Sequence, residues 1–388
     1  MKTRILIVGG GFVGLRVAQL LSRRCNGYEV MLVDKKREFL FTPWLVDAFA
    51  GEIKLENVTV GFPELAKQDG FTFLQVEALY VDRAAKRVRV ARGEKKEDIP
   101  YDLLVLSHGA RTCYYGIPGA QEYSFPLKNP QDDARAQDAI LETLAKASKT
   151  KGSERERLLS MAVVGAGPTG IESVFAIKQF IERGQKEKKI DAELKPRFHL
   201  IQGAPQILPG FPDAVVRHAN AELDRQGMQT LTGEAVTKVE PGLIHTVSGK
   251  TIPTSFILWS AGIEPCPIEI RPPVVTEHGG YPAVDNYFRL DPSIFSAGDV
   301  SGFRMKGAPV PKTAQTAMQM APVLAKNILR TLAGKKLVPF RTSQKGVVIT
   351  LGDTGVISLK HALTMKTKLA IPLRNLYYLL RFKQMTKR

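Results

Sequence analysis

The chain has 388 residues, of which 44% are hydrophobic and 24% are charged, and it carries a formal net charge of +17. This length is too great for one small core and predicts two or three domains, while the composition is that of a soluble globular protein. The charge favours an anionic partner, namely a membrane surface, a nucleic acid or a phosphorylated ligand, over a basic surface without a partner. Because no run of about 18 apolar residues is present, we expect no helix that spans a bilayer.

The cysteines and the N-terminus exclude further classes. Cys25, Cys113 and Cys266 form no C-x-x-C pattern, which argues against a disulfide framework and against a zinc site, so no metal is expected and a reducing compartment fits. The apolar N-terminus runs directly into a glycine-rich loop, which is not how a signal peptide ends.

The N-terminal stretch organises the rest of the chain. Residues 4–8 form an aliphatic, β-branched run typical of a buried parallel strand, and residues 9–14 follow it with the pattern G-x-G-x-x-G. A helical pattern over residues 15–24 and a second strand over residues 29–33 come next. That strand ends on Asp34, about 20 residues past the last glycine, where an acid can bind a ribose. This order predicts a dinucleotide site rather than a chance glycine turn.

Each residue type in this loop has its own expected task. Gly9 permits the tight turn, Gly11 lets the backbone approach a pyrophosphate, and Gly14 lets the helix and the strand pack closely. The helix N-terminus offers free N–H groups and the positive end of a dipole to phosphates. Asp34 can accept hydrogen bonds from an adenosine ribose.

The next segment combines an apolar loop with strands. Residues 35–51 contain aromatic and aliphatic side chains that would either lie against a flat ring or belong to the core, and the pattern leaves both open. Residues 71–81 are predicted as a strand, and residues 101–106 form another. Small residues at positions 107–111 leave room at the carboxyl edge of the sheet, where ligands bind. Within them, His108 is expected to be a loop residue rather than a catalytic base.

The opening pattern returns in the middle of the chain. A helix is predicted over residues 130–149, followed by a hydrophilic linker or helix end over residues 149–157 and a strand over residues 158–164. A second G-x-G-x-x-G occupies residues 165–170, and its helix over residues 171–181 is extended by an exposed charged insertion, residues 182–195. The next strand, residues 198–201, ends on Gln202. Two such patterns in one chain are far more specific than either alone.

Two further strands and a helix complete this part. Residues 256–259 form a buried strand that opens into a small-residue turn, and residues 294–296 form another that leads to Asp299. Asp299 is placed to meet a ligand hydroxyl, and a helix N-cap or turn is the alternative. A helix is predicted over residues 311–332, with a kink or a break at Pro322.

The tail, residues 335–388, has a different character. No acidic residue follows Asp353, whereas lysine and arginine continue to the end. An apolar stripe with the spacing i, i+3, i+4, i+7 is formed by Leu373, Leu376, Tyr377 and Leu380. A basic amphipathic helix of this kind suits the interface of an anionic bilayer. The alternative is a helix that docks on its own domain, or on a second copy of the chain to give a homodimer.

Together these residues resemble the two-dinucleotide-binding-domain flavoproteins and, among them, the type II NADH dehydrogenases, which are single-subunit NAD(P)H:quinone oxidoreductases. The likeness covers nearly the whole chain. The stretches that carry it are residues 8–14, Asp34 with residues 39–43, residues 165–172, residues 295–299 and residues 314–319. The last stretch, Ala-Gln-Thr-Ala-Met-Gln, is similar to the family's A-Q-x-A-x-Q signature at the quinone side.

The resemblance implies an α/β fold of two Rossmann-like dinucleotide-binding domains, the second inserted in the first, plus a C-terminal basic amphipathic segment. Residues 1–111 and 263–334 would form the FAD-binding domain, and residues 112–262 the NAD(P)H-binding domain. Residues 335–388 would serve membrane association or dimer formation.

It also implies FAD, with NADH or NADPH, as cofactors. The adenosine diphosphate half of FAD would lie on the first glycine loop, the isoalloxazine near Thr42 and Pro43, and the ribityl chain at Asp299. The helix beginning near Thr313 would point its N-terminus at the flavin and stabilise charge on the reduced ring. The cofactor-binding positions are Gly9, Gly11, Phe12, Val13, Gly14, Asp34, Lys35, Thr42, Pro43, Ala78, Ser107, Gly109, Asp299, Ala314, Gln315, Thr316, Gly165, Gly167, Thr169, Gly170, Gln202, Ala261 and Gly262.

The implied chemistry is a relay without proton pumping. NAD(P)H gives a hydride to the flavin, and a quinone then accepts two electrons and two protons. Glu172 would lie near the nicotinamide and the flavin, orienting the one and moving a proton, and its alternative is an acid stabilised by a helix N-terminus. Gln315 and Gln319 would face the quinone pocket. These three residues are the catalytic candidates.

The chain departs from the family pattern at Gln202, where relatives often have glutamate. A carboxylate there binds the ribose 2′-hydroxyl and repels a 2′-phosphate. Gln202 removes that repulsion, so NADPH is expected to be tolerated or preferred.

The expected partners are a quinone and an anionic membrane surface, with the protein peripheral on the cytoplasmic side of the cell membrane and part of a respiratory chain. No nucleic-acid-binding motif is present, and none is expected to act. The alternatives are a sulfide:quinone oxidoreductase, which needs a redox-active cysteine pair, a reductase with a soluble acceptor, and a non-catalytic flavin-bound redox sensor or nucleic-acid-binding protein.

Overall fold

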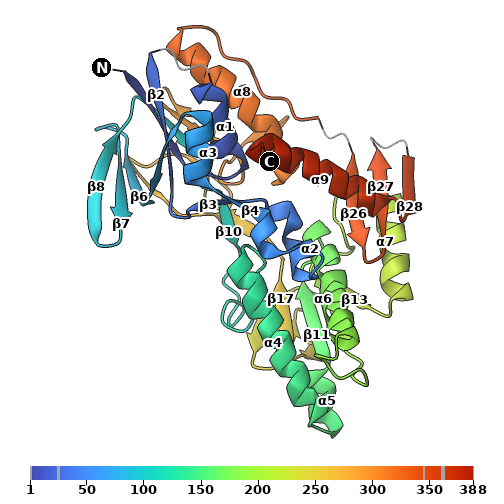
Figure 1. The fold of residues 1–388 in the computed structure, drawn as a ribbon. Coiled ribbons are helices and arrows are strands. Elements are labelled where there is room, and N and C mark those ends of the chain that lie inside the picture. The colour runs from blue at the N-terminus through green and yellow to red at the C-terminus, as the bar shows by residue number, and fades with distance from the viewer. Residues whose placement is uncertain (1, 24–26, 344–345, 360–362, 388) are drawn as a thin grey trace.

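The computed structural model describes residues 2–23, 27–343, 346–359 and 363–387. Two largely parallel sheets form its centre, each covered by helices, and a smaller C-terminal unit packs along one side of both halves (Figure 1). The fold is α/β, with two Rossmann-like halves, as the sequence predicted.

The first sheet has the strand order β22-β23-β9-β1-β2-β5. Only β22 runs antiparallel to its neighbour. The strands are β1 (Thr3–Val8), β2 (Tyr28–Asp34), β5 (Thr72–Gln75), β9 (Leu103–Leu106), β22 (Arg289–Asp291) and β23 (Ile294–Ser296). Because strand side chains alternate, Ile5 and Ile7 of β1 face one core, with α1 (Phe12–Ser22) and α8 (Ala314–Leu332), whereas Leu6 and Val8 face another.

The second sheet has the order β13-β12-β11-β17 and is parallel throughout. Its strands all lie between residues 160 and 259, inside the span that separates β9 from β22: β11 (Ser160–Val164), β12 (Arg197–Gln202), β13 (Gln229–Thr232) and β17 (Phe256–Trp259). Helices α4 (Pro130–Ser148) and α6 (Pro168–Lys186) cover one face through a buried cluster that includes Met161 and Val163. The second half is therefore inserted in the first.

The chain passes between the two halves through a narrow antiparallel pair, β10 (Ala110–Thr112) with β18 (Ile263–Pro265). Smaller sheets flank the two large ones. They are β3 (Glu38–Leu40) with β4 (Thr59–Gly61); β6 (Glu77–Asp82), β7 (Arg87–Arg92) and β8 (Lys95–Pro100) with β19 (Glu269–Arg271); β14 (Val236–Glu240), β15 (Leu243–Thr246) and β16 (Thr251–Pro253); β20 (Thr276–Glu277) with β21 (Tyr281–Pro282); and β24 (Arg304–Met305) with β25 (Ala308–Pro309).

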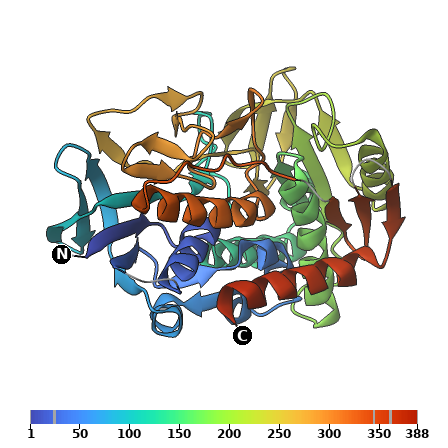
Figure 2. The same ribbon diagram turned by 90° about the horizontal axis from the view of Figure 1, so that it is seen from above.

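The C-terminal unit consists of the antiparallel sheet β26 (Val347–Leu351), β27 (Thr354–Leu359) and β28 (Leu363–Thr367), followed by helix α9 (Ala370–Thr386). Helix α9 starts beside this sheet and ends against α1, so it runs along one side of the molecule (Figures 1 and 2). The remaining helices are α2 (Leu45–Phe49), α3 (Phe62–Asp69), α5 (Gly152–Leu158) and α7 (Asp213–Arg225), with the 3₁₀ turns η1 (Thr42–Trp44) and η2 (Leu55–Val58).

Two sequence predictions about elements were wrong. Residues 71–81 are not one strand, because the chain breaks at Val76 and divides between β5 and β6 of different sheets. The hydrophilic stretch over residues 149–157, predicted as a linker or a helix end, contains a helix of its own, α5. In both cases tertiary packing overrode a local pattern. The charged segment over residues 182–195 is mostly exposed, as predicted, and its first residues continue α6 to Lys186, while the apolar Ile190 and Leu194 within it are buried.

Candidate functional site

The first glycine loop has the backbone geometry expected of it. Gly9 has φ +98°, and a Cβ there would lie 2.3 Å from the Cα of His108. A Cβ on Gly14 would lie 1.9 Å from the Gly9 carbonyl oxygen, so only glycine allows α1 to pack this closely. Gly11, in contrast, has no atom within 4 Å of its Cβ position. That open side, at the N-terminus of α1, fits a pyrophosphate.

Asp34 helps to shape this loop. Its Oδ2 accepts a hydrogen bond from the backbone N–H of Gly10 at 2.7 Å, and its Oδ1 accepts one from the N–H of Lys36 at 2.8 Å. A carboxylate oxygen has more than one lone pair, so a ribose hydroxyl can still donate to it.

The second glycine loop has nearly the same backbone conformation and the same kinds of contact as the first. Gly165 has φ +101°, and a Cβ on Gly170 would lie 1.7 Å from the Gly165 carbonyl oxygen. Gln202 takes the place of Asp34, because its Oε1 accepts a hydrogen bond from the N–H of Ala166 at 3.1 Å. A Cβ on Gly165 would meet Ala261 at 2.6 Å, which places the turn after β17 at the edge of this loop.

A serine completes each loop. The Ser107 hydroxyl donates to the carbonyl oxygens of Val8 and Gly9, at 3.1 and 2.9 Å. The Ser260 hydroxyl donates in the same way to those of Val164 and Gly165, at 3.1 and 3.0 Å. Ser107 thus acts on the loop rather than pointing at a cofactor. The sequence analysis missed Ser260, although its position after an apolar strand mirrors that of Ser107.

Several other predicted cofactor-binding residues have side chains that are already engaged. Phe12 packs edge-on against Phe39, with ring centroids 5.4 Å apart, and Val13 is buried in the first core. Lys35 lies 3.6 Å from Glu77 in an exposed ion pair. Ala78 packs against the core beneath the first sheet. Any contact these residues make with a cofactor is therefore through backbone atoms or the remaining side-chain surface.

The aromatic loop over residues 35–51 belongs to the core rather than lying free against a ring. Phe41 and Trp44 are buried and contact Phe382 of α9, with centroids 5.5 and 5.1 Å apart. Thr42 and Pro43 lie in the 3₁₀ turn η1 between them.

A small hollow of about 140 Å³ lies where α8 begins, lined by Gly298, Asp299, Pro311, Lys312, Thr313, Thr316, Ala317 and Met320. Thr313 caps α8, since its Oγ1 accepts a hydrogen bond from the N–H of Thr316 at 3.2 Å. Ala314, Gln315 and Thr316 form the first turn, with Thr316 buried. Burial raises the pKa of Asp299, against the opposing effect of Lys128 and Lys312. A helix N-terminus beside a partly buried carboxylate fits the polar chain and ring of FAD.

His108 is a structural residue. Its Nε2 lies 3.2 Å from the carbonyl oxygen of Cys266, and burial lowers the pKa of the imidazole to about 4. The ring is thus neutral at physiological pH, as expected for a loop histidine.

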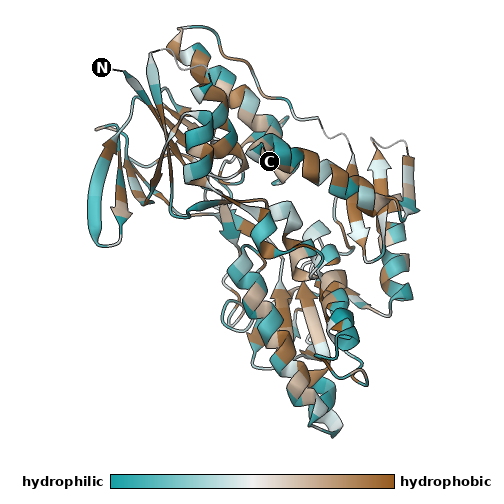
Figure 3. Cartoon of the chain, in the orientation of Figure 1, coloured by the Kyte–Doolittle hydropathy of each residue, from teal (hydrophilic) through white to brown (hydrophobic). Residues whose placement is uncertain are grey.

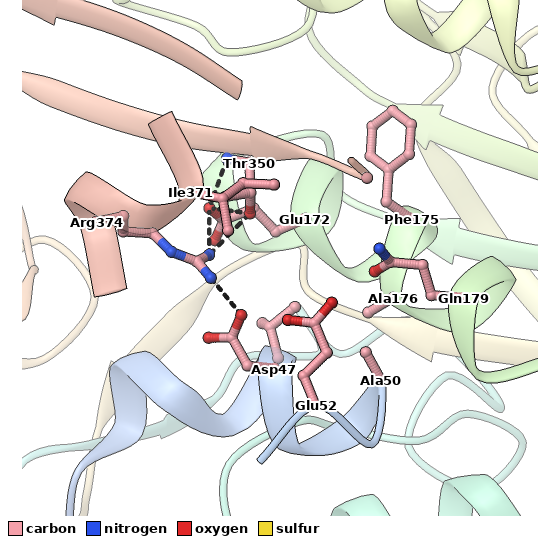
Figure 4. Close-up of a pocket in the computed structure, with 12 residues that line it drawn as sticks. Asp47, Ala50, Glu52, Glu172, Phe175, Ala176, Gln179, Thr350, Ile371 and Arg374 are labelled. Atoms are coloured by element: carbon pink, nitrogen blue, oxygen red, sulfur yellow. Dashed lines mark hydrogen bonds and ion pairs between the residues drawn. The ribbon is translucent and has the colours of Figure 1, made fainter. Parts of the chain in front are cut away.

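A deeper cavity, with an empty volume of about 300 Å³, lies where α2, α6 and the C-terminal unit meet (Figure 4). Arg374 of α9 reaches into it and is only 4% exposed. Its Nη2 donates to Oδ1 of Asp47, its Nη1 donates to Oγ1 of Thr350 at 2.8 Å, and the same nitrogen lies 3.6 Å from Glu172. Neither Arg374 nor Asp47 belongs to a sequence motif, so neither could be predicted as a site residue.

Glu172 is turned towards the C-terminal unit. Its Oε1 accepts two hydrogen bonds from Thr350, from the N–H at 3.0 Å and from the hydroxyl at 2.9 Å. Burial raises the pKa of Glu172, with Arg374 opposing it. The residue thus belongs to an ionic cluster with Arg374 and Asp47, and its place near the nicotinamide and the flavin stays a prediction.

The cavity holds more acids than bases. Desolvation raises the pKa values of Asp47 and Glu52, as it does for Glu172, and one guanidinium faces all three. In the part of the chain that the structure describes, Oδ2 of Asp47 and Nε of Arg374 are buried without a hydrogen-bond partner. Unpaired buried polar atoms beside an open volume can bind a small polar ligand or pass a proton.

Gln315 and Gln319 are not among the residues that line this cavity. The Gln319 amide binds the segment after α8: its Nε2 donates to the carbonyl oxygen of Ser343 at 3.1 Å, and its Oε1 accepts from the Ser343 N–H at 2.9 Å. Their role at a quinone site stays a prediction.

The cysteines in the described ranges are both free. Cys113 is buried and Cys266 partly so, and burial raises the pKa of each thiol. A raised pKa disfavours the reactive thiolate. Cys25 lies outside the described residues.

The tail carries an exposed apolar face. The residues of α9 that the sequence predicted as an apolar stripe are exposed, as are apolar residues of the adjoining strands and turn; the exposed apolar residues of this region are Leu359, Leu363, Met365, Leu369, Leu373, Leu376, Tyr377, Leu379 and Leu380. Figure 3 shows hydrophobic and hydrophilic residues mixed along α9. The opposite side of α9 buries Phe382 and Met385 in the first core. No helix among the described residues combines the length and apolar character that crossing a bilayer requires.

Two known proteins are similar in sequence to most of this chain. The chain is 28% identical over 370 residues to the type II NADH:quinone oxidoreductase of Staphylococcus aureus, a match that covers 91% of this chain and 88% of the relative. It is also 28% identical over 282 residues to the external alternative NAD(P)H-ubiquinone oxidoreductase B3 of Arabidopsis thaliana mitochondria. That match covers 69% of this chain but only 48% of the plant protein, so the chain spans about half of that relative.

Solved structures extend the similarity of fold. NDH2 of Plasmodium falciparum, solved with NADH, has a TM-score of 0.88 at 19% identity, covering 97% of this chain and 94% of its own. The sulfide:quinone oxidoreductase of Aquifex aeolicus has a TM-score of 0.81 at 19% identity, covering 99% and 92%. Residues 3–321 match the sequence family of pyridine nucleotide-disulphide oxidoreductases. The chain therefore belongs to the pyridine nucleotide-disulphide oxidoreductase family.

Proposed function

We propose that this chain is an FAD-dependent NAD(P)H:quinone oxidoreductase that works at a membrane surface. The observation that carries the proposal is the pair of matching glycine loops, each at the carboxyl edge of its own parallel sheet. One loop serves FAD and the other the nicotinamide cofactor. The names of the staphylococcal and plant relatives support the activity and the acceptor.

The proposed role of each domain follows from the fold. Residues 1–111 and 263–334 form the FAD-binding domain, residues 112–262 bind NAD(P)H, and residues 335–388 form the membrane segment or the interface of a homodimer. When bound, FAD supplies the chemistry that accepts a hydride and passes two electrons on. The two loops hold the cofactors by their backbone N–H groups and helix N-termini, with Asp34 and Gln202 at the riboses.

The buried ionic cluster supplies a proton. A quinone needs two electrons and two protons to become a quinol, and a hydride brings two electrons with one proton only. Glu172 is suited to hold the second proton, because both hydrogen bonds from Thr350 go to Oε1 and leave Oε2 as the oxygen to be protonated. Its raised pKa favours the protonated form, and Glu52 lies at the exposed side of the same cavity.

The exposed apolar face of the tail supports a membrane partner. Leucine and tyrosine face outward from α9, and lysine and arginine occur throughout the tail without any acidic residue after Asp353. An apolar face with basic neighbours suits an anionic bilayer, where a quinone dissolves. The cytoplasmic side of the cell membrane is the proposed location, and a second copy of the chain is the competing occupant of this face.

The deciding experiment is anaerobic reduction of the purified protein. NADH and NADPH are each expected to bleach the flavin absorbance, and a soluble quinone is expected to restore it in the absence of oxygen. A flavin that oxygen reoxidises but quinone does not would overturn the acceptor. Protein purified without any flavin, and unable to bind added FAD, would overturn the proposal as a whole.

A further inference from the structure

One ammonium group in the described residues has an unusual place. Lys312 immediately precedes Thr313, the N-cap of α8, and lines the small hollow beside Asp299. Its Nζ donates to the carbonyl oxygen of Ser301 and lies 4.6 Å from the centre of the Tyr281 ring. No motif in the sequence identified this residue.

Holding a lysine here is costly. Burial lowers the pKa of the Lys312 ammonium to about 8, with Asp299 opposing the shift. A carbonyl oxygen and the face of a tyrosine are weaker partners for a cation than a carboxylate. A desolvated lysine at the wall of a hollow therefore indicates a further negative partner that the site is built to receive.

The local balance of charge supports this reading. Asp299 is the carboxylate that faces Lys312, and it also faces a second desolvated ammonium, that of Lys128, whose pKa is lowered by burial. Lys128 also faces Asp132, so Asp299 is not its only acidic neighbour, whereas Asp299 is the acid that faces Lys312. The N-terminus of α8 adds partial positive charge on the same side. Lys312 and this helix terminus together bring positive charge to the hollow beside Asp299.

We propose that Lys312 is a cofactor-tuning residue, whose ammonium stabilises the negative charge that the flavin gains on reduction. A hydride transfers two electrons and one proton, so an uncharged ring system that accepts it gains one negative charge. The Lys312 ammonium, beside the N-terminus of α8, stabilises the reduced, negatively charged flavin and therefore raises its midpoint potential. This inference rests on the flavin half of the proposed function and not on the identity of the final acceptor.

A purely structural role makes a different prediction. The bond from Lys312 to Ser301 would then serve only to hold the loop that leads into α8. Loss of the amine would lower the melting temperature and leave the flavin potential unchanged.

The test compares Lys312→Met and Lys312→Arg with Lys306→Met, which removes an exposed lysine from the preceding hairpin turn. Spectroelectrochemical titration with redox dyes gives the midpoint potential of each FAD-loaded protein between pH 6 and 9.5. Lys312→Met is expected to have a more negative potential, with the ratio of reduced to oxidised flavin at fixed dye potential falling about tenfold or more. Lys312→Arg and Lys306→Met are expected to keep the wild-type value.

The pH profile gives a second readout. The difference between wild type and Lys312→Met is expected to be largest below about pH 8, where the amine is protonated, and to shrink above it. Equal potentials at every pH would overturn the inference, even if the variant is less stable. If Lys312→Met fails to hold FAD, Lys312→Gln and Lys312→Arg are compared in excess FAD, and equal potentials in that pair would overturn it.

The result is separable from the test of the proposed function. A wild-type flavin that shows the lysine-dependent potential but is not reoxidised by quinone would leave this inference standing and remove the acceptor. Unchanged flavin potentials in the Lys312 variants, together with normal reduction of quinone, would overturn this inference and leave the acceptor standing.

Discussion

Gln202 and Asp34 occupy equivalent places in two loops of the same shape, yet they differ in charge. Each side-chain oxygen accepts a hydrogen bond from a backbone N–H of its glycine loop. The amide of Gln202 can also bind a ribose hydroxyl, but it does not repel a 2′-phosphate. The loop that follows, residues 203–212, contains no lysine or arginine to attract one. The chain is therefore expected to use NADH and NADPH with similar efficiency.

Replacing Gln202 by glutamate is expected to create discrimination. In Gln202→Glu, kcat/KM for NADPH should fall at least about tenfold relative to that for NADH, which corresponds to about 1.4 kcal/mol. Steady-state kinetics with both nucleotides measure the ratio. A wild-type protein that already prefers NADH tenfold would contradict the interpretation, whatever the variant does.

Asp133 is the most unusual single carboxylate outside the two sites. It is fully buried in the first turn of α4, and neither carboxylate oxygen has a hydrogen-bond partner within the described ranges. Desolvation raises its pKa to about 8, so the folded protein binds a proton that the unfolded chain releases near pH 4. Stability is therefore lost as pH rises from about 4 to about 8.

The substitution Asp133→Asn removes this dependence. Relative to wild type, the variant is expected to gain about 1.4 kcal/mol for each pH unit between about 5 and 8. Denaturant unfolding at several pH values measures the slope. Asp138→Asn, at an exposed position on the same helix, is the control and should show no such trend. Parallel pH profiles for Asp133→Asn and wild type would refute the assignment of a neutral buried acid.

Helix α9 has its apolar stripe on the exposed side, whereas one of its cationic side chains is buried inside the protein. The buried cation is Arg374, which bonds Asp47 and lies beside Glu172. Removing one member of a buried ion pair leaves the others desolvated and unpaired, which costs about 3–5 kcal/mol. Charged contacts thus hold α9 to α2 and α6, and the apolar side chains of Phe382 and Met385 pack it against the first core.

Arg374→Gln is accordingly expected to lower the free energy of unfolding by about 3–5 kcal/mol. Lys383→Gln, an exposed substitution on the same helix, should change it by less than about 0.5 kcal/mol. Combining Arg374→Gln with Asp47→Asn should recover part of the loss, since the unpaired carboxylate is removed as well. Equal stability of Arg374→Gln and the control would show that the cluster contributes nothing.

The exposed stripe predicts a separate effect on membrane binding. The double variant Leu376→Glu/Leu380→Glu is expected to bind anionic liposomes roughly tenfold or more weakly, because two apolar contacts become charged, while its melting temperature stays near that of wild type. Flotation assays measure the bound fraction. Val275→Glu, at an exposed apolar position on another part of the surface, is the control. A dimer that dissociates in the double variant, with unchanged liposome binding, would assign this face to a second copy.

At the scale of the whole molecule, the tail joins parts that are distant in sequence. Lys366 of β28 donates to Glu222 of α7, and Lys387 donates to the buried Asp69 at the end of α3. Between these contacts, α9 closes the ionic cavity and completes the first core. The tail, predicted as a segment for membrane association or dimer formation, is thus also part of the folded structure.

Deletion of residues 370–388 is therefore expected to do more than weaken membrane binding. The shortened chain should melt at least several degrees lower and bind a hydrophobic dye, because Phe41 and Trp44 lose their cover. Calorimetry and dye fluorescence, with the Leu376→Glu/Leu380→Glu variant as reference, measure the difference. A truncated chain as stable as wild type would show that α9 is an appendage.

The sequence determined the two nucleotide-binding loops, because their chemistry is local. Gly9, Gly14 and Asp34 act on residues within a few positions or on the adjacent parallel strand, so spacing alone predicts their geometry. It also determined which residues of α9 share one apolar face, since helical periodicity is a local property, whereas the exposure of that face follows from the packing of the rest of the helix. The domain boundaries and the cofactor contacts stay predictions drawn from those motifs.

Only the tertiary structure decided what Glu172, Arg374, Asp47 and Lys312 do. Asp47 and Arg374 are 327 positions apart, and no periodicity relates them. Whether a charged side chain is solvated or buried depends on what the rest of the chain places around it, and that is a property of the completed packing. The physical effects that single these residues out, desolvation and the long-range pairing of charges, exist only once the fold has formed.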